Sequence, residues 1–125
     1  MSARVMIAED EPSILESLEF LMRNAGFETR SVRDGDLAAA CLEAFRPHLL
    51  LLDVMLPGKS GLEICRQLRA DPQHAGIRVL ILTAKGGRID GGVAAECGAD
   101  EYLAKPFSTR ELLVRVNALL APGER

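Results

Sequence analysis

The chain has 125 residues, of which 48% are hydrophobic and 26% charged. This is enough for one soluble globular domain with a sizeable core. The net charge of −3 argues against a basic nucleic-acid-binding surface, and no apolar run approaches the roughly 18 residues that a membrane span needs. The first residues lead straight into a strand-like run and show no signal peptide. We therefore expect a cytoplasmic protein whose three cysteines are reduced and packed in the core.

The first half of the chain predicts two strand–helix units. Residues 5–8 form a short apolar run, and Pro12 suits the first turn of a helix that Gly26 closes. Residues 27–32 predict a second strand, whose more polar sequence places it nearer an edge of the sheet. The next helix, residues 37–45, is expected to bury one apolar stripe. That stripe consists of Leu37, Ala40, Cys41, Ala44 and Phe45.

The middle of the chain contains an uninterrupted run of four leucines, residues 49–52, that ends at Asp53. Such a run is typical of a strand buried on both faces, which belongs to a parallel sheet. A third helix follows through residues 62–68. Residues 79–82 predict another buried strand, which ends at Thr83.

The last third predicts one more strand between two helices. The helix expected at residues 89–97 is weakened by Gly91 and Gly92, since glycine lowers helix stability by roughly 1 kcal/mol relative to alanine. Residues 101–104 form the fifth strand, and residues 112–120 the fifth helix. Five strands alternating with five helices predict an α/β fold: a doubly wound parallel sheet with helices on both faces. We assign residues 1–121 to this domain and residues 122–125 to a tail or the start of a linker.

Polar side chains follow four of the five predicted strands. They are Glu9, Asp10, Asp53, Thr83 and Lys105. In doubly wound sheets, ligands bind beyond the carboxyl ends of the strands, so these side chains are expected to converge on one crevice. Three carboxylates would repel one another, and a hard divalent cation such as Mg²⁺ would relieve the repulsion. An aspartate held beside a metal and a lysine is a reasonable nucleophile toward a phosphoryl group.

Four separated blocks of sequence resemble the receiver domains of two-component response regulators. The blocks are residues 9–12 (EDEP), residues 52–57 (LDVMLP) with Gly61, residues 82–84 (LTA) and residues 98–107 (GADEYLAKPF). The resemblance covers essentially the whole chain. It implies a flavodoxin-like sheet with strand order 2-1-3-4-5 and a cis bond before Pro106.

The resemblance also implies a function and a role for each site residue. Asp53 would accept a phosphoryl group from a sensor histidine kinase or phosphotransfer protein, without direct nucleic-acid contact by this chain. Mg²⁺, with Mn²⁺ as an alternative, would bind Asp10, Asp53 and the backbone carbonyl of Met55, with Glu9 assisting. Thr83 and Lys105 would bind the phosphoryl oxygens. Thr83 and Tyr102 would then switch the face formed by the fourth helix, fifth strand and fifth helix.

Three other interpretations fit parts of the sequence. A phosphatase of the haloacid dehalogenase type resembles this pattern, but its second aspartate is replaced here by Met55, so we expect a signalling switch and not a turnover enzyme. Gly58-Lys59-Ser60 looks like the end of a phosphate-binding loop, but Asp53 stands where that motif needs glycine. A passive binding module would have no reason to keep the acidic, threonine and lysine positions together.

The pattern of charges that supports dimerisation in many related transcription factors is only partly present. Asp100, Glu101, Glu111 and Arg115 look like members of it, whereas the fourth helix carries glycine where basic residues are usual. Acidic groups without partners at an interface lower affinity. We expect a monomer or a weak phosphorylation-dependent dimer.

Overall fold

The computed structural model describes residues 3–83 and 97–121. Its five strands form one parallel sheet with the order β2-β1-β3-β4-β5, as predicted. The strands are β1 (Arg4–Ala8), β2 (Glu28–Val32), β3 (Leu49–Asp53), β4 (Arg78–Thr83) and β5 (Glu101–Ala104). The more polar β2 lies at one edge, and the four leucines of β3 are completely buried at the centre. Burial of β3 on both faces explains why its sequence does not alternate.

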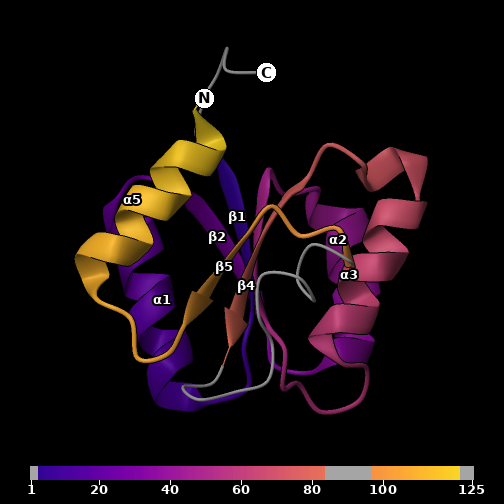
Figure 1. Cartoon of the computed structure of the whole chain (residues 1–125), viewed down its shortest axis with the longest axis horizontal. Coiled ribbons are helices and arrows are strands. Elements are labelled where there is room, and N and C mark those ends of the chain that lie inside the picture. The colour runs from indigo at the N-terminus through magenta and orange to yellow at the C-terminus, as the bar shows by residue number, and fades with distance from the viewer. Residues whose placement is uncertain (1–2, 84–96, 122–125) are drawn as a thin grey trace.

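Helices cover both faces of the sheet (Figure 1). The α-helices of the described ranges are α1 (Pro12–Asn24), α2 (Ala38–Phe45), α3 (Gly61–Ala70) and α5 (Thr109–Leu120), and two short 3₁₀ turns are η1 (Gly35–Leu37) and η2 (Pro72–His74). α1 and α5 pack on one face, and α2 and α3 on the other. Two buried clusters result, one on each side of the sheet. The helix predicted at residues 89–97 lies outside the described residues except for Cys97, as do the tail residues 122–125.

Local capping sets where several helices begin. Pro12 occupies the first turn of α1, as expected. Ser60 and Ser108 cap α3 and α5, because each hydroxyl accepts a hydrogen bond from the backbone N–H of the residue three positions later. The two serines therefore fix the starts of the helices that follow β3 and β5.

The apolar stripe predicted for the second helix is correct for Phe45 and the partly buried Cys41 but wrong for its other three members. The buried side chains of α2 are Ala38, Leu42 and Phe45, whereas Leu37, Ala40 and Ala44 are exposed. Residues 37–45 carry only one charged side chain, Glu43, so the helix is apolar on nearly every side and periodicity does not define its buried face. The Asp34 carboxylate caps η1 by accepting a hydrogen bond from the Asp36 N–H, and α2 continues from this turn.

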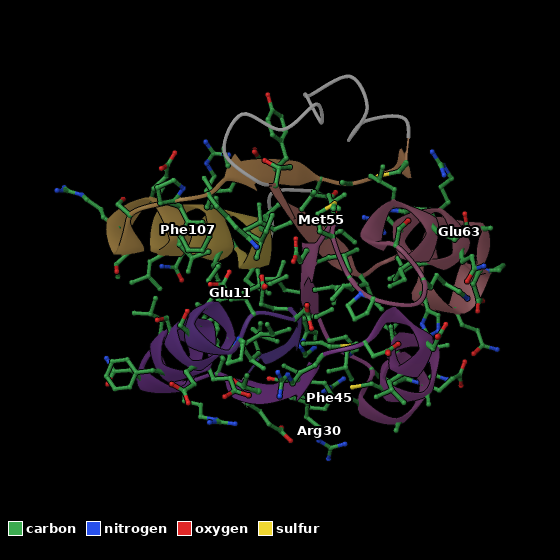
Figure 2. All side chains as sticks on the ribbon, turned by 90° about the horizontal axis from the view of Figure 1, so that it is seen from below. Glu11, Arg30, Phe45, Met55, Glu63 and Phe107 are labelled. Carbon is green, nitrogen blue, oxygen red and sulfur yellow. The ribbon has the colours of Figure 1, made fainter. Side chains whose placement is uncertain are left out.

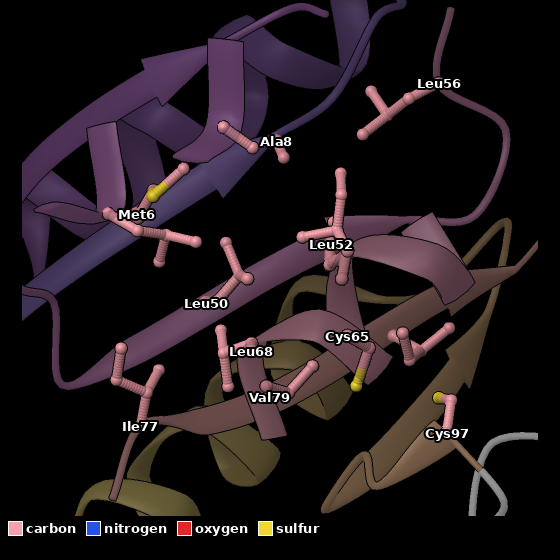
Figure 3. Close-up of a cluster of buried hydrophobic side chains, with 14 of the residues drawn as sticks. Met6, Ala8, Leu50, Leu52, Leu56, Cys65, Leu68, Ile77, Val79 and Cys97 are labelled. Carbon is pink, nitrogen blue, oxygen red and sulfur yellow. The ribbon is translucent and has the colours of Figure 1, made fainter. Parts of the chain in front are cut away.

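Two of the three cysteines are packed in the core as predicted, whereas Cys41 is only half-buried. Cys65 and Cys97 are buried next to each other in the cluster between the sheet and α3 (Figure 3). Burial raises the pKa of the Cys65 thiol to about 12, and the neighbouring Cys97 adds to the effect. A thiol with so high a pKa is not nucleophilic at neutral pH, so Cys65 serves packing.

None of the helices in the described ranges combines the length and the apolar character that crossing a membrane would require.

Candidate functional site

The carboxyl ends of β1, β3, β4 and β5 bring the predicted site residues to one edge of the sheet. The register pairs Ala8 with Leu52, and Thr83 with Ala104. The backbone continues this pairing beyond β5, because the Lys105 N–H donates to the Thr83 carbonyl at 2.7 Å. The residues that follow the strands, which include the predicted ligands, therefore lie side by side.

Lys105 bridges two buried carboxylates from different strands. Its Nζ lies 3.0 Å from Glu9 Oε1 and 3.4 Å from Asp53 Oδ2. Glu9 is 0% exposed and Asp53 is 4% exposed. Buried charges need partners, so Lys105 partly neutralises both acids.

Backbone N–H groups orient each of these carboxylates. The Met55 N–H donates to Asp53 Oδ1 at 3.1 Å, and the Glu11 N–H donates to Glu9 Oε2 at 3.0 Å. In both side chains, one oxygen is thus held by the loop that follows the strand, and the other faces Lys105. This leaves the Asp53 carboxylate in a fixed position at the end of β3.

The cluster carries more negative than positive charge. Burial raises the pKa of the Glu9 carboxyl, while the Glu11 N–H and Lys105 lower it and the Asp53 carboxylate raises it further. Glu9 Oε1 makes its ion-pair contact with Lys105 outside hydrogen-bond geometry, and it has no other partner among the described residues. The site therefore has a buried oxygen that a cation could still engage.

An open cavity of about 720 Å³ lies against this cluster. Asp10 and Met55 line it with Glu9, Asp53 and Lys105. Further walls come from α1, from the loop between β5 and α5, and from the first residue of α5, and they include Ile14, Leu21, Phe107 and Thr109. Figure 2 looks onto this edge of the sheet, with Glu11, Met55 and Phe107 labelled. Asp10 is exposed, and Met55 is 71% exposed. A ligand entering from solvent would meet Asp10 and Met55 at the cavity rim.

The donor set fits a hard divalent cation. All the acidic ligands predicted for it, Glu9, Asp10 and Asp53, line the same cavity and offer oxygen atoms. With Glu11, four acidic side chains line the cavity against the one ammonium group that the described residues supply, and oxygen-rich sites with excess negative charge favour Mg²⁺.

Thr83 and Tyr102 are less closely tied to the cluster. Thr83 ends β4 with only 3% of its surface exposed, and its hydroxyl forms no hydrogen bond within the described part of the chain. Tyr102 lies on β5 and is 40% exposed. The bond between Lys105 and Pro106 is cis, as the resemblance implied.

Gly61 is a positioning residue whose role the sequence did not reveal. A Cβ atom on Gly61 would collide with the carbonyl oxygen of Asp53 and crowd the Cα of Val54. The Gly61 N–H also donates to the Val54 carbonyl at 3.1 Å. The start of α3 therefore packs directly on the backbone that carries Asp53. Gly61 belongs to the motif, but only the tertiary contact shows why glycine is needed.

The fold and the site together define a class of protein: a doubly wound α/β domain with an acidic cleft that holds Lys105 at the carboxyl edge of its sheet. The family model described as the response regulator receiver domain matches residues 5–117. The chain is 42% identical over 124 residues to the DNA-binding response regulator MtrA of Mycolicibacterium smegmatis, covering 99% of this chain and 53% of that protein. The chain thus spans about half the length of the curated relatives it matches.

Solved structures give the same result. A signal receiver domain of a histidine kinase from Syntrophus aciditrophicus has a TM-score of 0.90 and 33% identity, covering 99% of this chain and 94% of that one. The receiver domain of a sensor histidine kinase from Pseudomonas aeruginosa, which holds a magnesium ion in its active-site cleft, has a TM-score of 0.85 and 28% identity, with coverage of 95% and 98%. The chain belongs to the response-regulator receiver family of two-component signalling systems.

Proposed function

We propose that Asp53 is the phosphoacceptor of this receiver domain. The observation that carries the proposal is the fixed Asp53 carboxylate, which the Met55 N–H and Lys105 hold at the wall of an open cavity. An oxygen of Asp53 attacks the phosphorus of a phosphohistidine on a sensor histidine kinase or phosphotransfer protein. The new bond joins this oxygen to phosphorus, and the phosphorus–nitrogen bond breaks as the imidazole leaves.

Lys105 has two roles in this proposal. Before transfer it neutralises Asp53 and Glu9, and afterwards its ammonium group binds a phosphoryl oxygen. Thr83, at the end of the neighbouring strand, offers a hydroxyl donor to another oxygen. Glu9, Asp10, Asp53 and the Met55 carbonyl would hold Mg²⁺, or Mn²⁺ in its place. The ion would supply neutralisation of the charge that develops on the phosphoryl oxygens.

Phosphorylation would act as a switch and not as one step of a turnover cycle. The position where a related phosphatase carries its acid–base aspartate is Met55, a thioether side chain that cannot activate water. Asp53 phosphate would therefore be lost slowly. The change would reach the face of β5 and α5 through Thr83, the last residue of β4, and Tyr102, which lies on β5.

The output of the whole protein is a separate proposal. A relative named as a DNA-binding response regulator is about twice as long as this chain. If the protein continues in the same way, DNA binding would belong to the additional half, and the receiver would regulate it without contacting nucleic acid.

Incubation with Mg²⁺ and acetyl phosphate tests the proposed function. Intact-mass spectrometry should show the gain of one labile phosphoryl group by the parent chain and by Asp71→Asn, which alters a carboxylate outside the cleft. Asp53→Ala should show none, because the nucleophile is missing. Labelling of Asp53→Ala at the parent level would refute the assignment, and continuous release of phosphate would indicate a phosphatase.

A further inference from the structure

A second cluster of ionisable side chains lies away from the cleft, on the face of the sheet covered by α2 and α3. Glu43 comes from α2, His74 ends the turn η2 that follows α3, and Asp71 is the N-cap of that turn. One ligand atom from each of the three residues lies within 4.8 Å of the other two. This is the arrangement that a metal site requires before an ion draws its ligands together.

His74 is the central group of the cluster. Its Nε2 lies 3.5 Å from Glu43 Oε2 and 3.8 Å from Asp71 Oδ2. The residue is only 6% exposed, yet its imidazole takes part in no hydrogen bond within the described part of the chain. Buried imidazoles are normally hydrogen-bonded. The Nε2 of His74 is thus directed at two carboxylates, both at ion-pair distance.

The local structure of η2 holds Asp71 and His74 on one side of the turn. Side chains three residues apart eclipse each other in a 3₁₀ helix. The Asp71 carboxylate caps this turn by accepting the Gln73 N–H at Oδ1, 2.9 Å away, and its carbonyl accepts the His74 N–H at 3.0 Å. One carboxylate oxygen is therefore fixed, and Oδ2 faces the imidazole.

In Glu43, too, one carboxylate oxygen faces a neighbouring group and the other faces His74. Arg46 lies 3.8 Å from Glu43 Oε1 and also donates to Gln73 Oε1 at 3.2 Å, leaving Glu43 Oε2 toward His74. A cavity of about 150 Å³ adjoins the three residues. Lys59, which lines this cavity, donates to Gln67 Oε1 at 2.9 Å and is thus engaged elsewhere.

These distances and ligand types point to a transition metal. Zn²⁺ binds imidazole nitrogen and carboxylate oxygen at about 2.0–2.2 Å, which in a tetrahedron separates ligand atoms by roughly 3.3–3.6 Å. The separation of 3.5 Å between His74 and Glu43 fits, and that of 3.8 Å to Asp71 needs a shift of a few tenths of an ångström. Mg²⁺ prefers oxygen ligands alone and suits the cleft better.

We propose that Glu43, Asp71 and His74 form a binding site for one divalent ion of the zinc class, with a fourth position open to water. Glu43 is exposed and Asp71 is half-buried, so the ion has access from solvent on the Glu43 side. When bound, it would join α2 to the turn between α3 and β4. The site shares no residue with the Asp53 cleft.

Calorimetric titration of the apo chain with Zn²⁺, in excess Mg²⁺ to fill the cleft, tests the proposal. The parent should bind one Zn²⁺ per chain. His74→Gln should lower the affinity about tenfold or more, because even outer-sphere changes at metal sites cost about 10–100-fold. Glu43→Gln and Asp71→Asn should also weaken binding, and neither replaces a buried side chain, so the fold should tolerate both. Asparagine at position 71 can still cap η2.

The chain provides a matched control in its other histidine. His48 Nδ1 accepts the Arg4 N–H at 2.9 Å and lies outside the cluster, so His48→Gln should bind Zn²⁺ like the parent. With only two histidines, NMR can assign both rings, and Zn²⁺ should shift the His74 signals alone. Parent-like affinity in Glu43→Gln and Asp71→Asn would overturn the proposal, as would unshifted His74 signals. If a cysteine held the Zn²⁺, the affinity would be unchanged in His74→Gln, Glu43→Gln and Asp71→Asn, and this result too would overturn the proposal.

Discussion

The molecule holds two carboxylate clusters that differ in how they are built. In the cleft, backbone N–H groups orient Glu9 and Asp53, and Lys105 lies between them. In the cluster of Glu43, Asp71 and His74, the basic group is an imidazole, and side chains and a short turn do most of the positioning. The cleft offers oxygen ligands and an open cavity, whereas the second cluster includes a nitrogen ligand.

This difference separates the expected chemistry of the two clusters. Oxygen ligands favour Mg²⁺ and phosphoryl groups, and a mixed nitrogen and oxygen set favours zinc-class ions. Strand ends fix the cleft through the main chain, so it depends on backbone packing. The second cluster depends on an exposed carboxylate, a half-buried carboxylate and the turn η2.

The largest effect is expected from Gly61→Ala. Alanine is the better helix former, so any loss must come from its collision with the Asp53 carbonyl. Such overpacking should lower the free energy of unfolding by about 1–3 kcal/mol, and the labelling of Asp53 by acetyl phosphate should also fall. Urea denaturation measures the change in the free energy of unfolding. Gly76→Ala is the control, because a Cβ there meets no atom within 4 Å and should leave stability and labelling unchanged. Equal behaviour of the two variants would mean that packing at Gly61 does not position Asp53.

Asp10→Asn should separate the metal preferences of the two clusters. Asp10 is exposed, so the fold should persist, but the cleft loses one of its carboxylates. Affinity for Mg²⁺ should fall about tenfold or more, and phosphorylation should slow. Titration with Mg²⁺ and then Zn²⁺ measures both sites in one sample. Unchanged Mg²⁺ binding would reject Asp10 as a ligand, and a parallel loss of Zn²⁺ binding would show that the clusters are not independent.

Glu9→Gln should stabilise the metal-free protein by about 1 kcal/mol near neutral pH, because it removes an incompletely paired buried charge. Burial raises the folded-state pKa of Glu9 above 4.5. Glu9 therefore favours the folded state fully below its unfolded-state pKa, where it is protonated. This contribution is lost as the pH rises through the folded-state pKa, because the buried carboxyl then ionises. The advantage of the glutamine variant should shrink as the pH falls toward 4.5.

Thermal unfolding with and without Mg²⁺ measures this effect. Added Mg²⁺ should reverse the order of the two proteins, since the parent binds the ion more tightly. A glutamine variant that is less stable at every pH would show that Lys105 compensates Glu9 fully.

Met55→Asn or Met55→Asp should hydrolyse the Asp53 phosphate a few-fold faster than the parent, since a polar side chain at the cavity rim can orient water. Met55 is 71% exposed, so its replacement should not disturb the fold. Val114→Asn, at another exposed apolar position, is the control. Mass spectrometry of the phosphorylated proteins over time measures the rate at which each loses its phosphoryl group. An unchanged or slower rate would remove the shielding role of Met55.

The smallest effect concerns a third charged group, on β5 and α5. Arg115 pairs within the chain with Glu101 at 2.8 Å and Glu111 at 3.6 Å, and Asp100 pairs with Arg69 at 2.6 Å. Charges that are already satisfied are less available to a second copy, so we expect a monomer or weak dimer after beryllofluoride treatment. Light scattering at micromolar concentration should give the same mass for the parent and Arg115→Ala. A tight dimer that Arg115→Ala abolishes would contradict this.

The sequence predicted the parts of the fold that local patterns encode. The four leucines before Asp53 indicated a central strand, and the more polar residues 27–32 indicated the edge strand, both as observed. The pattern failed for α2, because a helix that is apolar on nearly every side buries the face that its neighbours select. The cluster around His74 was not predicted at all. Only Asp71 and His74 are close in sequence, and Glu43 comes from another helix.

By itself, the sequence determined the type and order of the elements, the family, and the set of polar residues that follow the strands. Hydrophobic runs and capping residues act over a few positions, so they can be read directly from the chain. The tertiary structure decided which atoms meet: Lys105 with Glu9 and Asp53, Gly61 with the Asp53 carbonyl, and His74 with Glu43. These contacts depend on strand register and helix packing, which place residues distant in sequence within a few ångströms of each other.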